Sequence, residues 1–195
     1  YASSMSVYGD QPNIPITEEA STLPKSFYAV GKLASKHYLE IYSKYNIDIV
    51  ALRLFNVYGP GQNMENLKQG MVSIFLAQAL SNKHILVKGS PERFRDLVYI
   101  DDIVNSFTIF LGANKSGYRC YNVSTGVRTT VSELLEKIIT YLPYEVMVEY
   151  SDPTPGDQFG IYGDATKIEK ELGWKYQTDL DEGLKRMIKL TKKYR

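Results

Sequence analysis

The sequence predicts an α/β protein built on parallel strands, and its order of elements supports this. A compact β-branched run at residues 47–52 follows an apolar-periodic segment at 28–46, and a helix followed by a buried strand is half of a βαβ unit. A short strand ends at Ser4, ahead of that helix. In open parallel sheets ligands gather at the carboxyl ends of the strands. We therefore expect Ser4 and the pair Phe55-Asn56 to lie at a binding edge.

Composition narrows the class of protein. The 195 residues are 44% hydrophobic and 23% charged, which is typical of one large globular domain or two small ones. The net charge of +1 gives no electrostatic reason to expect nucleic acid or an anionic membrane as a partner. We find no secretory leader and no apolar run near the roughly 20 residues that span a bilayer. A single cysteine, Cys120, excludes an intrachain disulfide, and a cytoplasmic enzyme is expected.

The first half of the chain alternates loops with periodic segments. Residues 10–27 are rich in proline and polar groups and are expected to form a loop, and the helix over 28–46 follows. A long polar connection is expected after the strand, and such loops are usually functional. The remaining expectations are a connection at 56–69, a helix at 71–80 and a strand at 85–87.

The second half carries clear capping signals. Asp101-Asp102 is expected to cap a helix that runs to about residue 111, and Thr130 to cap a helix that ends at 142. Gly173 is expected to end the helix at 165–172, because many helices end at a glycine in the left-handed conformation. Trp174 is expected to pack at that corner. The expected strands are 97–100, 120–123 and 146–150, and a last helix opens at Asp179 or Asp181.

The stretch Tyr28-Ala-Val-Gly-Lys32 carries the main chemical hypothesis. A spacing of four places both side chains on one face of a helix. An ammonium near a phenol favours the phenolate and lowers the tyrosine pKa, and a serine hydroxyl can bind the same substrate oxygen. Such a trio suits proton removal from an alcohol while a nicotinamide accepts the hydride. Taken alone, the pair is more often a chance pair on a solvated helix face.

Further motifs give the pair its context. The chain carries Ser3-Ser-Met-Ser-Val-Tyr-Gly9, Arg53-Leu-Phe-Asn-Val-Tyr-Gly-Pro-Gly61 and Arg95-Asp-Leu-Val-Tyr-Ile-Asp-Asp102 in this order. Together these blocks resemble the extended short-chain dehydrogenase/reductase family, and within it the NAD-dependent nucleotide-sugar epimerases and dehydratases of the UDP-glucose 4-epimerase type. The resemblance covers residues 1 to about 192. It implies the second half of a doubly wound, Rossmann-type sheet with a smaller α/β substrate-binding domain.

The resemblance also implies roles for individual residues. Tyr28 would be the acid/base, Ser4 the matching hydroxyl with Ser3 and Ser6 as possible substitutes, and Lys32 would hold a cofactor ribose. Phe55 would flank the NAD cofactor beside Tyr28 and Lys32. The expected substrate-binding residues are Ser6, Asn56, Leu86, Val87, Lys88, Arg95 and Asp157. The alternative for Arg95, without a role in binding, is a surface ion pair with Asp96.

Two departures from the family pattern affect the expected reaction. The 4,6-dehydratases it resembles carry an Asp-Glu pair where this chain has Met5-Ser6, and elimination of water needs that extra acid and base. We therefore expect a 4-epimerase acting through a transient 4-keto sugar. The alternatives are a 4-ketoreductase, or a non-catalytic fragment of such an enzyme. Thr154 stands where uridine-sugar epimerases usually carry a second arginine that binds the diphosphate. We expect a UDP-sugar as the substrate. The missing arginine leaves two alternatives open: another nucleotide, or an arginine at a shifted position such as Arg93.

The same resemblance guides the expected organisation. The Gly-rich turn that grips a cofactor pyrophosphate is not found in the sequence, so the chain is expected to be the C-terminal portion of such an enzyme. We assign 1–58 and 97–113 to the dinucleotide-binding domain, and 59–96 and 114–195 to the substrate domain. A homodimer is expected by resemblance alone. No metal site is expected, because His37 and His84 lack partners at ligand spacing.

Overall fold

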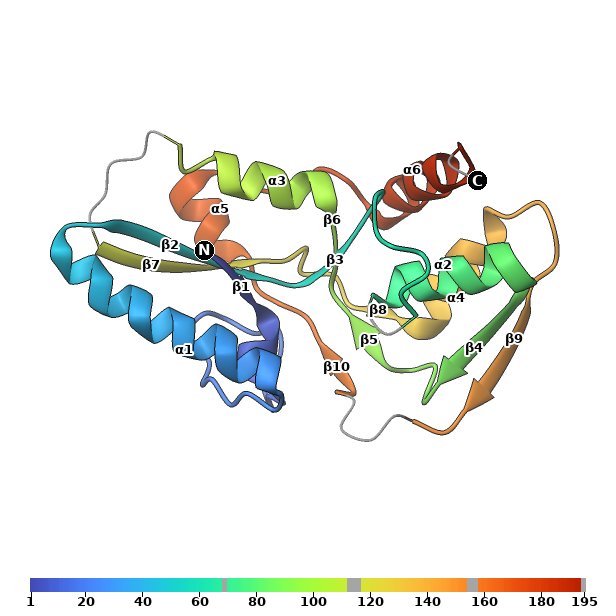
Figure 1. Cartoon of the computed structure of the whole chain (residues 1–195), viewed down its shortest axis with the longest axis horizontal. Coiled ribbons are helices and arrows are strands. Elements are labelled where there is room, and N and C mark those ends of the chain that lie inside the picture. The colour runs from blue at the N-terminus through green and yellow to red at the C-terminus, as the bar shows by residue number, and fades with distance from the viewer. Residues whose placement is uncertain (68–69, 112–116, 154–157, 194–195) are drawn as a thin grey trace.

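The computed structural model describes all residues except 68–69, 112–116, 154–157 and 194–195. Its largest sheet is parallel and has the order β1-β2-β7, formed by Ala2–Ser4, Asp48–Leu54 and Gly117–Val123. The helix α1, Phe27–Tyr42, lies on one side of this sheet (Figure 1). The helices α3, Ile100–Thr108, and α5, Thr166–Leu172, lie on the other side. Helices on both faces of a parallel sheet are the mark of a doubly wound fold, so the predicted fold class is confirmed.

The helix α1, Phe27–Tyr42, begins where its sequence contains a capping residue. Ser26 is the N-cap, and its Oγ accepts the N–H of Ala29 at 3.1 Å. After Tyr42 the chain makes one 3₁₀ turn, Ser43–Tyr45, and reverses at Asn46, which has φ 62°. Asparagine tolerates this left-handed conformation better than most residues. The expected helix to residue 46 is therefore one turn too long.

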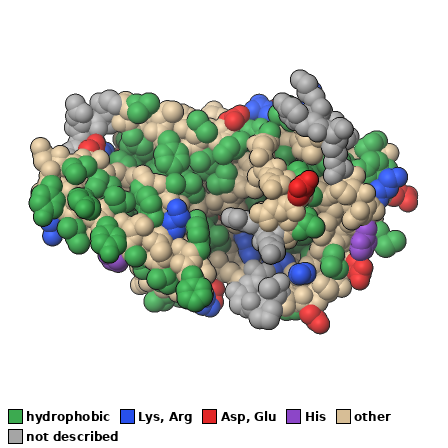
Figure 2. Space-filling view, viewed as in Figure 1, with side chains coloured by type: hydrophobic (Ala, Val, Ile, Leu, Met, Phe, Trp, Pro, Cys, Tyr) green, Lys and Arg blue, Asp and Glu red, His purple; other side chains and the backbone are tan. Residues whose placement is uncertain are grey.

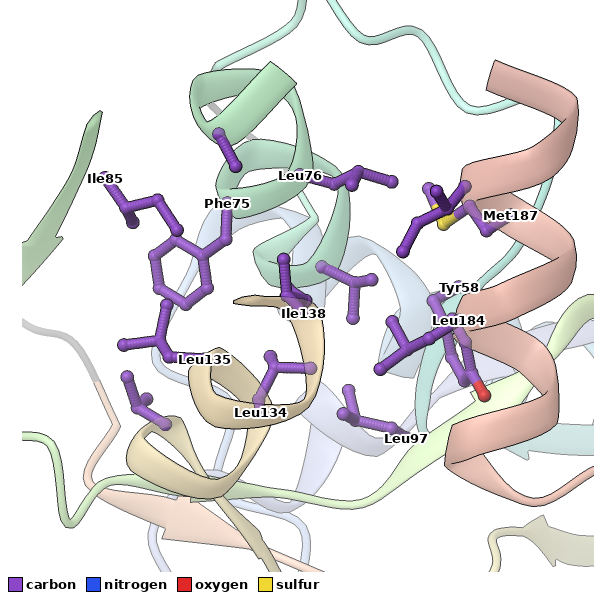
Figure 3. Close-up of a cluster of buried hydrophobic side chains, with 14 of the residues drawn as sticks. Tyr58, Phe75, Leu76, Ile85, Leu97, Leu134, Leu135, Ile138, Leu184 and Met187 are labelled. Atoms are coloured by element: carbon purple, nitrogen blue, oxygen red, sulfur yellow. The ribbon is translucent and has the colours of Figure 1, made fainter. Parts of the chain in front are cut away.

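The other part of the structure is built around α2, α4 and α6. Their side chains, with those of β4 and β6, form a buried cluster that includes Phe75, Leu134 and Leu184 (Figure 3). The helices are α2 Met71–Asn82, α4 Val131–Thr140 and α6 Leu180–Lys193. The strands are the parallel pair β4 His84–Lys88 and β9 Met147–Ser151, and the small sheet of β10 Gly160–Ile161, β5 Phe94–Arg95 and β8 Thr129–Thr130.

Two parallel strands connect the parts. They are β3, Asn56–Tyr58, and β6, Leu97–Tyr99, and they are followed by α3, Ile100–Thr108. A 3₁₀ turn at Met5–Tyr8 follows β1, and α5 spans Thr166–Leu172. A second buried cluster, which includes Leu52, Tyr121 and Trp174, joins residues of the sheet of β1, β2 and β7 to residues of α3 and α5. No helix among the described residues is long and apolar enough to cross a bilayer.

Capping at three helices tests the sequence signals. Thr130 and Glu133 form the predicted N-terminal cap of α4, and Gly173 ends α5 with φ 68°. The two aspartates predicted to cap α3 lie within its first turn instead. The Asp102 carboxylate is buried, and it accepts the backbone N–H groups of Gln177 and Thr178 at 2.9 and 3.1 Å. Asp102 therefore anchors the segment after α5, where Trp174 is buried as predicted.

The expected domain boundary at residue 114 does not follow the sheet. β7 pairs with β2 along its whole length, from Asp48 opposite Gly117 to Leu54 opposite Val123. Residues 117–123 thus lie in the sheet of the part to which they were not assigned, because a buried parallel strand belongs with the strand it pairs with. The division into a cofactor and a substrate domain stays a prediction.

Candidate functional site

A large cavity of about 1290 Å³ lies between the two parts. One wall is formed by β1, the start of α1 and the end of β2, and the other by α2, β4 and β5. Among the described residues that line it there is no aspartate or glutamate, whereas four are cations: Lys32, Lys88, Arg93 and Arg95. Figure 2 shows Lys and Arg side chains in the hollow near the centre of the face. The cavity therefore suits an anionic ligand.

The sequence pair Tyr28 and Lys32 lies on the wall of this cavity. Tyr28 is in the first turn of α1 and is 58% exposed. Lys32 Nζ lies 5.5 Å from the centre of the Tyr28 ring and donates a hydrogen bond to the carbonyl oxygen of Ala2 at 2.8 Å. One ammonium thus contacts both the phenol ring and strand β1. The spacing of four places both side chains on one helix face, as predicted.

The serines at the end of β1 line the same cavity. Ser4 is the last residue of β1 and the N-cap of the 3₁₀ turn. Its Oγ accepts the N–H of Ser6 at 3.2 Å and the hydroxyl of Ser6 at 2.9 Å. Ser3 is buried, and Met5 adds an apolar side chain to the wall. The structure therefore brings Ser4, Tyr28 and Lys32 to one hollow.

Phe55 and Asn56 follow β2 at its carboxyl end and also line the cavity. The Phe55 side chain is only 3% exposed, and a Cβ built on Gly163 would lie 2.4 Å from its ring. Its ring is therefore part of the second buried cluster, and little of it can flank a ligand. Asn56 is half-buried, and its side-chain Nδ2 donates to the carbonyl oxygen of Asp96 at 3.2 Å.

Arg95 is buried in the floor of the cavity, with 8% of it exposed. Its guanidinium donates to the carbonyl oxygens of Phe94 at 2.7 Å, Gln158 at 2.9 Å and Phe159 at 3.2 Å. Burial, and next the nearby charge of Arg93, lower the pKa of Arg95 to about 10. The alternative that Arg95 forms a surface ion pair with Asp96 is wrong, because the Arg95 guanidinium is buried.

Asp96 has a structural task of its own. It is buried, and its carboxylate accepts the N–H groups of Thr125 at 2.8 Å, Gly126 at 3.0 Å and Gly163 at 3.2 Å. Burial raises the pKa of this carboxyl group, and these hydrogen bonds act in the opposite direction. Asp96 thereby holds the segments around Thr125 and Gly163 against the link between β5 and β6.

Strand β4 contributes to the cavity through alternate residues. Leu86 and Lys88 line it, whereas Val87 is fully buried in the cluster of Figure 3. Successive side chains of a strand point to opposite faces, so three consecutive residues cannot all present side chains to one ligand. The structure does not bring the Val87 side chain to the site. Asp157 and Thr154 lie outside the described residues.

Several polar residues of the cavity were not singled out by sequence reasoning. Gln78, on α2, lines the wall, and its Oε1 accepts the N–H of Leu86 at 3.0 Å. Gln62 and Asn63 come from the connection after β3. A polar residue within the apolar run Phe75-Leu-Ala-Gln-Ala-Leu80 was the available signal for Gln78. Among the described residues, no group of three or more His, Cys, Asp or Glu could hold a metal ion.

One known protein family matches almost the whole chain. The family model described as GDP-mannose 4,6 dehydratase matches residues 1–187. The chain belongs to this family. The resemblance to nucleotide-sugar epimerases and dehydratases that the motifs indicated is thereby confirmed. The family match covers every described element from β1 through most of α6.

Curated relatives within this family carry several activities. A putative UDP-glucose 4-epimerase of Methanocaldococcus jannaschii is 32% identical over 188 residues, which is 96% of this chain and 60% of the relative. A UDP-glucose 4-epimerase of Mycolicibacterium smegmatis is 34% identical, over 96% of the chain and 59% of the relative. A dTDP-4-dehydro-6-deoxyglucose reductase of Escherichia coli is 32% identical, over 96% and 59%. The chain thus spans about 60% of the length of these relatives.

Solved structures of the family share the fold. UDP-N-acetylglucosamine 4-epimerase from Methanobrevibacter ruminantium, solved with UDP-N-acetylmuramic acid, has a TM-score of 0.94 and 29% identity, over 100% of this chain and 63% of that protein. MoeE5, solved with UDP-glucose and NAD, has a TM-score of 0.89 and 26% identity, over 99% and 64%. Both are similar to this chain along almost its whole length.

Proposed function

We propose that the full-length protein is an NAD-dependent nucleotide-sugar 4-epimerase. One observation carries the proposal: Ser4, Tyr28 and Lys32 share one cavity with Lys88, Arg93 and Arg95, and its described lining contains no carboxylate. The first group suits proton transfer at an alcohol, and the second suits a diphosphate. Epimerases among the relatives and the solved structures support the assignment. Because the chain spans about 60% of those relatives, the activity is proposed for the whole protein.

The proposed chemistry assigns one task to each residue of the trio. Tyr28 takes the proton of the C4 hydroxyl and later returns it, since its phenol is exposed to the cavity. Ser4 donates a hydrogen bond to the same oxygen. Lys32 places its positive charge 5.5 Å from the centre of the Tyr28 ring and donates a hydrogen bond to the Ala2 carbonyl oxygen, so it holds the start of α1 against β1. When bound, NAD would accept the C4 hydride and return it to the opposite face of the sugar.

The residues at this wall fit a nicotinamide ribose. Lys32 and Tyr28 offer an ammonium and a hydroxyl on one helix face, and ribose hydroxyls can bind both. Phe55 contributes its backbone and the edge of a buried ring, so its proposed role beside the cofactor is a supporting one. NAD is present in the solved structure of MoeE5, which supports this cofactor. We propose that the part around β1, β2 and β7 holds NAD.

The opposite wall fits the nucleotide diphosphate. Arg93 and Arg95 are fixed by hydrogen bonds to backbone carbonyl groups, and Lys88 adds a third positive charge. Fixed guanidinium groups bind phosphate oxygens well because little side-chain entropy is lost. Asn56 and Ser6 also line the cavity, and the sugar hydroxyls would bind there. A UDP-sugar is the proposed substrate, supported by the relatives, and Leu86 would contact its nucleoside. The role of Asp157, which lies outside the described residues, stays a prediction.

Two other reactions are found among the relatives. Dehydration is disfavoured, because Met5 and Ser6 supply no acid or base and the described cavity lining has no carboxylate. Reduction of a 4-keto sugar is the second candidate, favoured by the similarity to the E. coli reductase. The same trio would serve it. Epimerisation uses no net NADH, whereas reduction consumes one NADH for each product.

The distinguishing experiment measures both quantities together. The full-length protein is incubated with UDP-glucose and NAD, the sugar products are followed by proton NMR, and NADH is followed by absorbance. We expect the C4 epimer to form with no change in NADH. Consumption of NADH with a 4-keto substrate, and no epimer from UDP-glucose, would support the reductase instead. Absence of both reactions with a range of nucleotide sugars would overturn the proposed function.

We also propose that the protein forms a homodimer through α1. Large apolar side chains along the outer face of this helix are exposed: Phe27, Val30, Tyr38, Ile41 and Tyr42. Apolar side chains of this kind are visible at the left end of the molecule in Figure 2. An exposed apolar stripe of this length is unusual in a monomer. A double change of Tyr38 and Ile41 to Glu should shift the mass in solution, measured by light scattering, from dimer to monomer.

A further inference from the structure

The order of the cavity walls indicates where each part of a nucleotide sugar lies, an inference that rests on the proposed function. Along the molecule, α1 and β1 lie at one end of the cavity, β5 lies in the middle, and α2 and β4 lie beyond it (Figure 1). The reacting sugar would lie at Tyr28 and the diphosphate at Arg95. The nucleoside comes next in the ligand, so its base reaches the wall made by α2 and β4.

Strand β4 presents a free edge to this wall. It pairs with β9 alone among the described strands. The N–H of Leu86 bonds to Gln78 Oε1, so it points away from β9. Because an N–H group can only donate, the bonded atom of the amide must be its oxygen. The orientation of the Gln78 amide is therefore fixed by the backbone of β4.

This orientation leaves the amide nitrogen of Gln78 for a ligand. The Nε2 group carries two donors, and within the part of the chain that the structure describes it has no hydrogen-bond partner. Leu86, half-buried on β4, adds an apolar side chain to the same wall, and Phe75, one turn earlier on α2, adds the small part of its side chain that the buried cluster leaves exposed. A flat ring would find apolar contact there, and its edge would meet a group that can only donate.

We propose that Gln78 selects the nucleobase by donating from Nε2 to a keto oxygen on the base edge farthest from the ribose. Uracil and thymine carry a keto oxygen at this edge, as does guanine. Cytosine and adenine carry an amino group there, which would place two donors against each other. A buried donor that loses its acceptor costs more than a simple change of contact area. The wall should therefore accept keto bases and reject amino bases.

The test compares UDP with CDP, whose bases differ at position 4, which is keto in uracil and amino in cytosine, and at N3, which carries a hydrogen only in uracil. Binding of each nucleotide to the full-length protein is measured by calorimetry. One hydrogen bond of this kind corresponds to a preference of about tenfold for UDP. In Gln78→Glu the carboxylate still accepts the N–H of Leu86, but the facing donor becomes an acceptor. The preference should then fall below one and favour CDP.

Two further variants separate this role from general effects. The new charge in Gln78→Glu repels both diphosphates equally, so the ratio of the two affinities removes that effect. Gln62→Glu places the same charge on another residue of the cavity lining and should leave the ratio unchanged. Gln78→Met removes both amide groups and should bring the ratio close to one. Thermal unfolding of each variant verifies that it is folded.

The outcomes divide the two proposals. If wild type binds UDP and the ratio is the same in Gln78→Glu, then Gln78 does not read the base and only this inference fails. If the ratio inverts although no epimerase activity is found, base selection stands and the proposed reaction fails. If wild type binds neither UDP nor any other nucleoside diphosphate, both are overturned.

Discussion

The hydroxyl of Ser6 donates to Ser4 Oγ over 2.9 Å, and the Ser6 backbone N–H donates to the same oxygen over 3.2 Å. A hydroxyl oxygen has two acceptor positions, and Ser6 fills both. The Ser4 hydroxyl can then interact with a ligand in the cavity only by donating its hydrogen. Ser6 is therefore best understood as a residue that makes Ser4 a donor, in addition to any contact with the sugar.

Replacing Ser6 by Ala tests this arrangement. The Ser4 hydroxyl would be free to rotate, so we expect kcat of the full-length enzyme to fall about tenfold, the value of one hydrogen bond, with little change in KM. Ser6→Thr keeps the hydroxyl and should retain activity. A rise in KM alone in Ser6→Ala would mean that Ser6 only binds substrate.

Lys32 is expected to be essential for both cofactor binding and proton transfer. Lys32→Met keeps the length of the side chain but removes the charge near Tyr28 and the bond to the Ala2 carbonyl group. We expect loss of most turnover and weaker NAD binding, measured by fluorescence of the reduced cofactor. Lys36→Met is the matched control, because Lys36 lies one turn further along and pairs with Glu40. Equal effects of both changes would argue for helix stability as the cause.

The lowered pKa of Arg95 leads us to expect that nucleotide binding depends on pH. Because its pKa is lowered to about 10, the guanidinium is charged below that pH and loses its charge above it. Arg95→Met should weaken UDP binding at pH 7.5 by roughly tenfold or more, the value of a charged hydrogen bond. The difference from wild type should shrink as the pH rises through about 10. Arg128→Met, outside the cavity lining, should leave binding unchanged.

The cap of α4 predicts a pH dependence of stability. Hydrogen bonds from the Thr130 backbone, and next from its side chain, lower the pKa of Glu133. Because the pKa of Glu133 is lower in the folded state, its carboxylate stabilises the folded state at pH values above its ordinary pKa of 4.5. This contribution is lost as the pH falls through the folded-state pKa. Glu133→Gln should lower the free energy of unfolding at pH 7 by about 0.5–1 kcal/mol. The loss should vanish as the pH falls through the folded-state pKa of Glu133, and Glu136→Gln should show neither effect.

Local signals in the sequence predicted much of the fold. Periodicity located α1 and β2, and capping residues such as Thr130 and Gly173 located helix ends within a residue or two. The spacing of Tyr28 and Lys32 is a local property of a helix, so their common face could be predicted. The role of Asp102 could not, because its partners Gln177 and Thr178 come from a segment more than 70 residues away.

The site depends on contacts that no local pattern encodes. The carbonyl groups around Arg95 come partly from residues 158–159, so its burial was not foreseen. The ring of Phe55 turns to Gly163 because glycine leaves room there. In the sequence, Gln78 is one polar residue within an apolar helix, and its role depends on β4, which lies beside it only in the folded structure. Sequence motifs thus predicted several of the residues that line one cavity, whereas the orientation of each side chain depends on contacts made in the folded structure.

The central claim, that Tyr28 transfers the C4 proton, is tested most directly by turnover of Tyr28→Phe in the full-length protein with UDP-glucose. Phenylalanine keeps the ring beside Lys32 and removes only the hydroxyl group. We predict that kcat falls by a factor of 100 or more, roughly the value of general acid–base catalysis, while UDP binds as tightly as in wild type. Unchanged turnover in Tyr28→Phe would contradict the account.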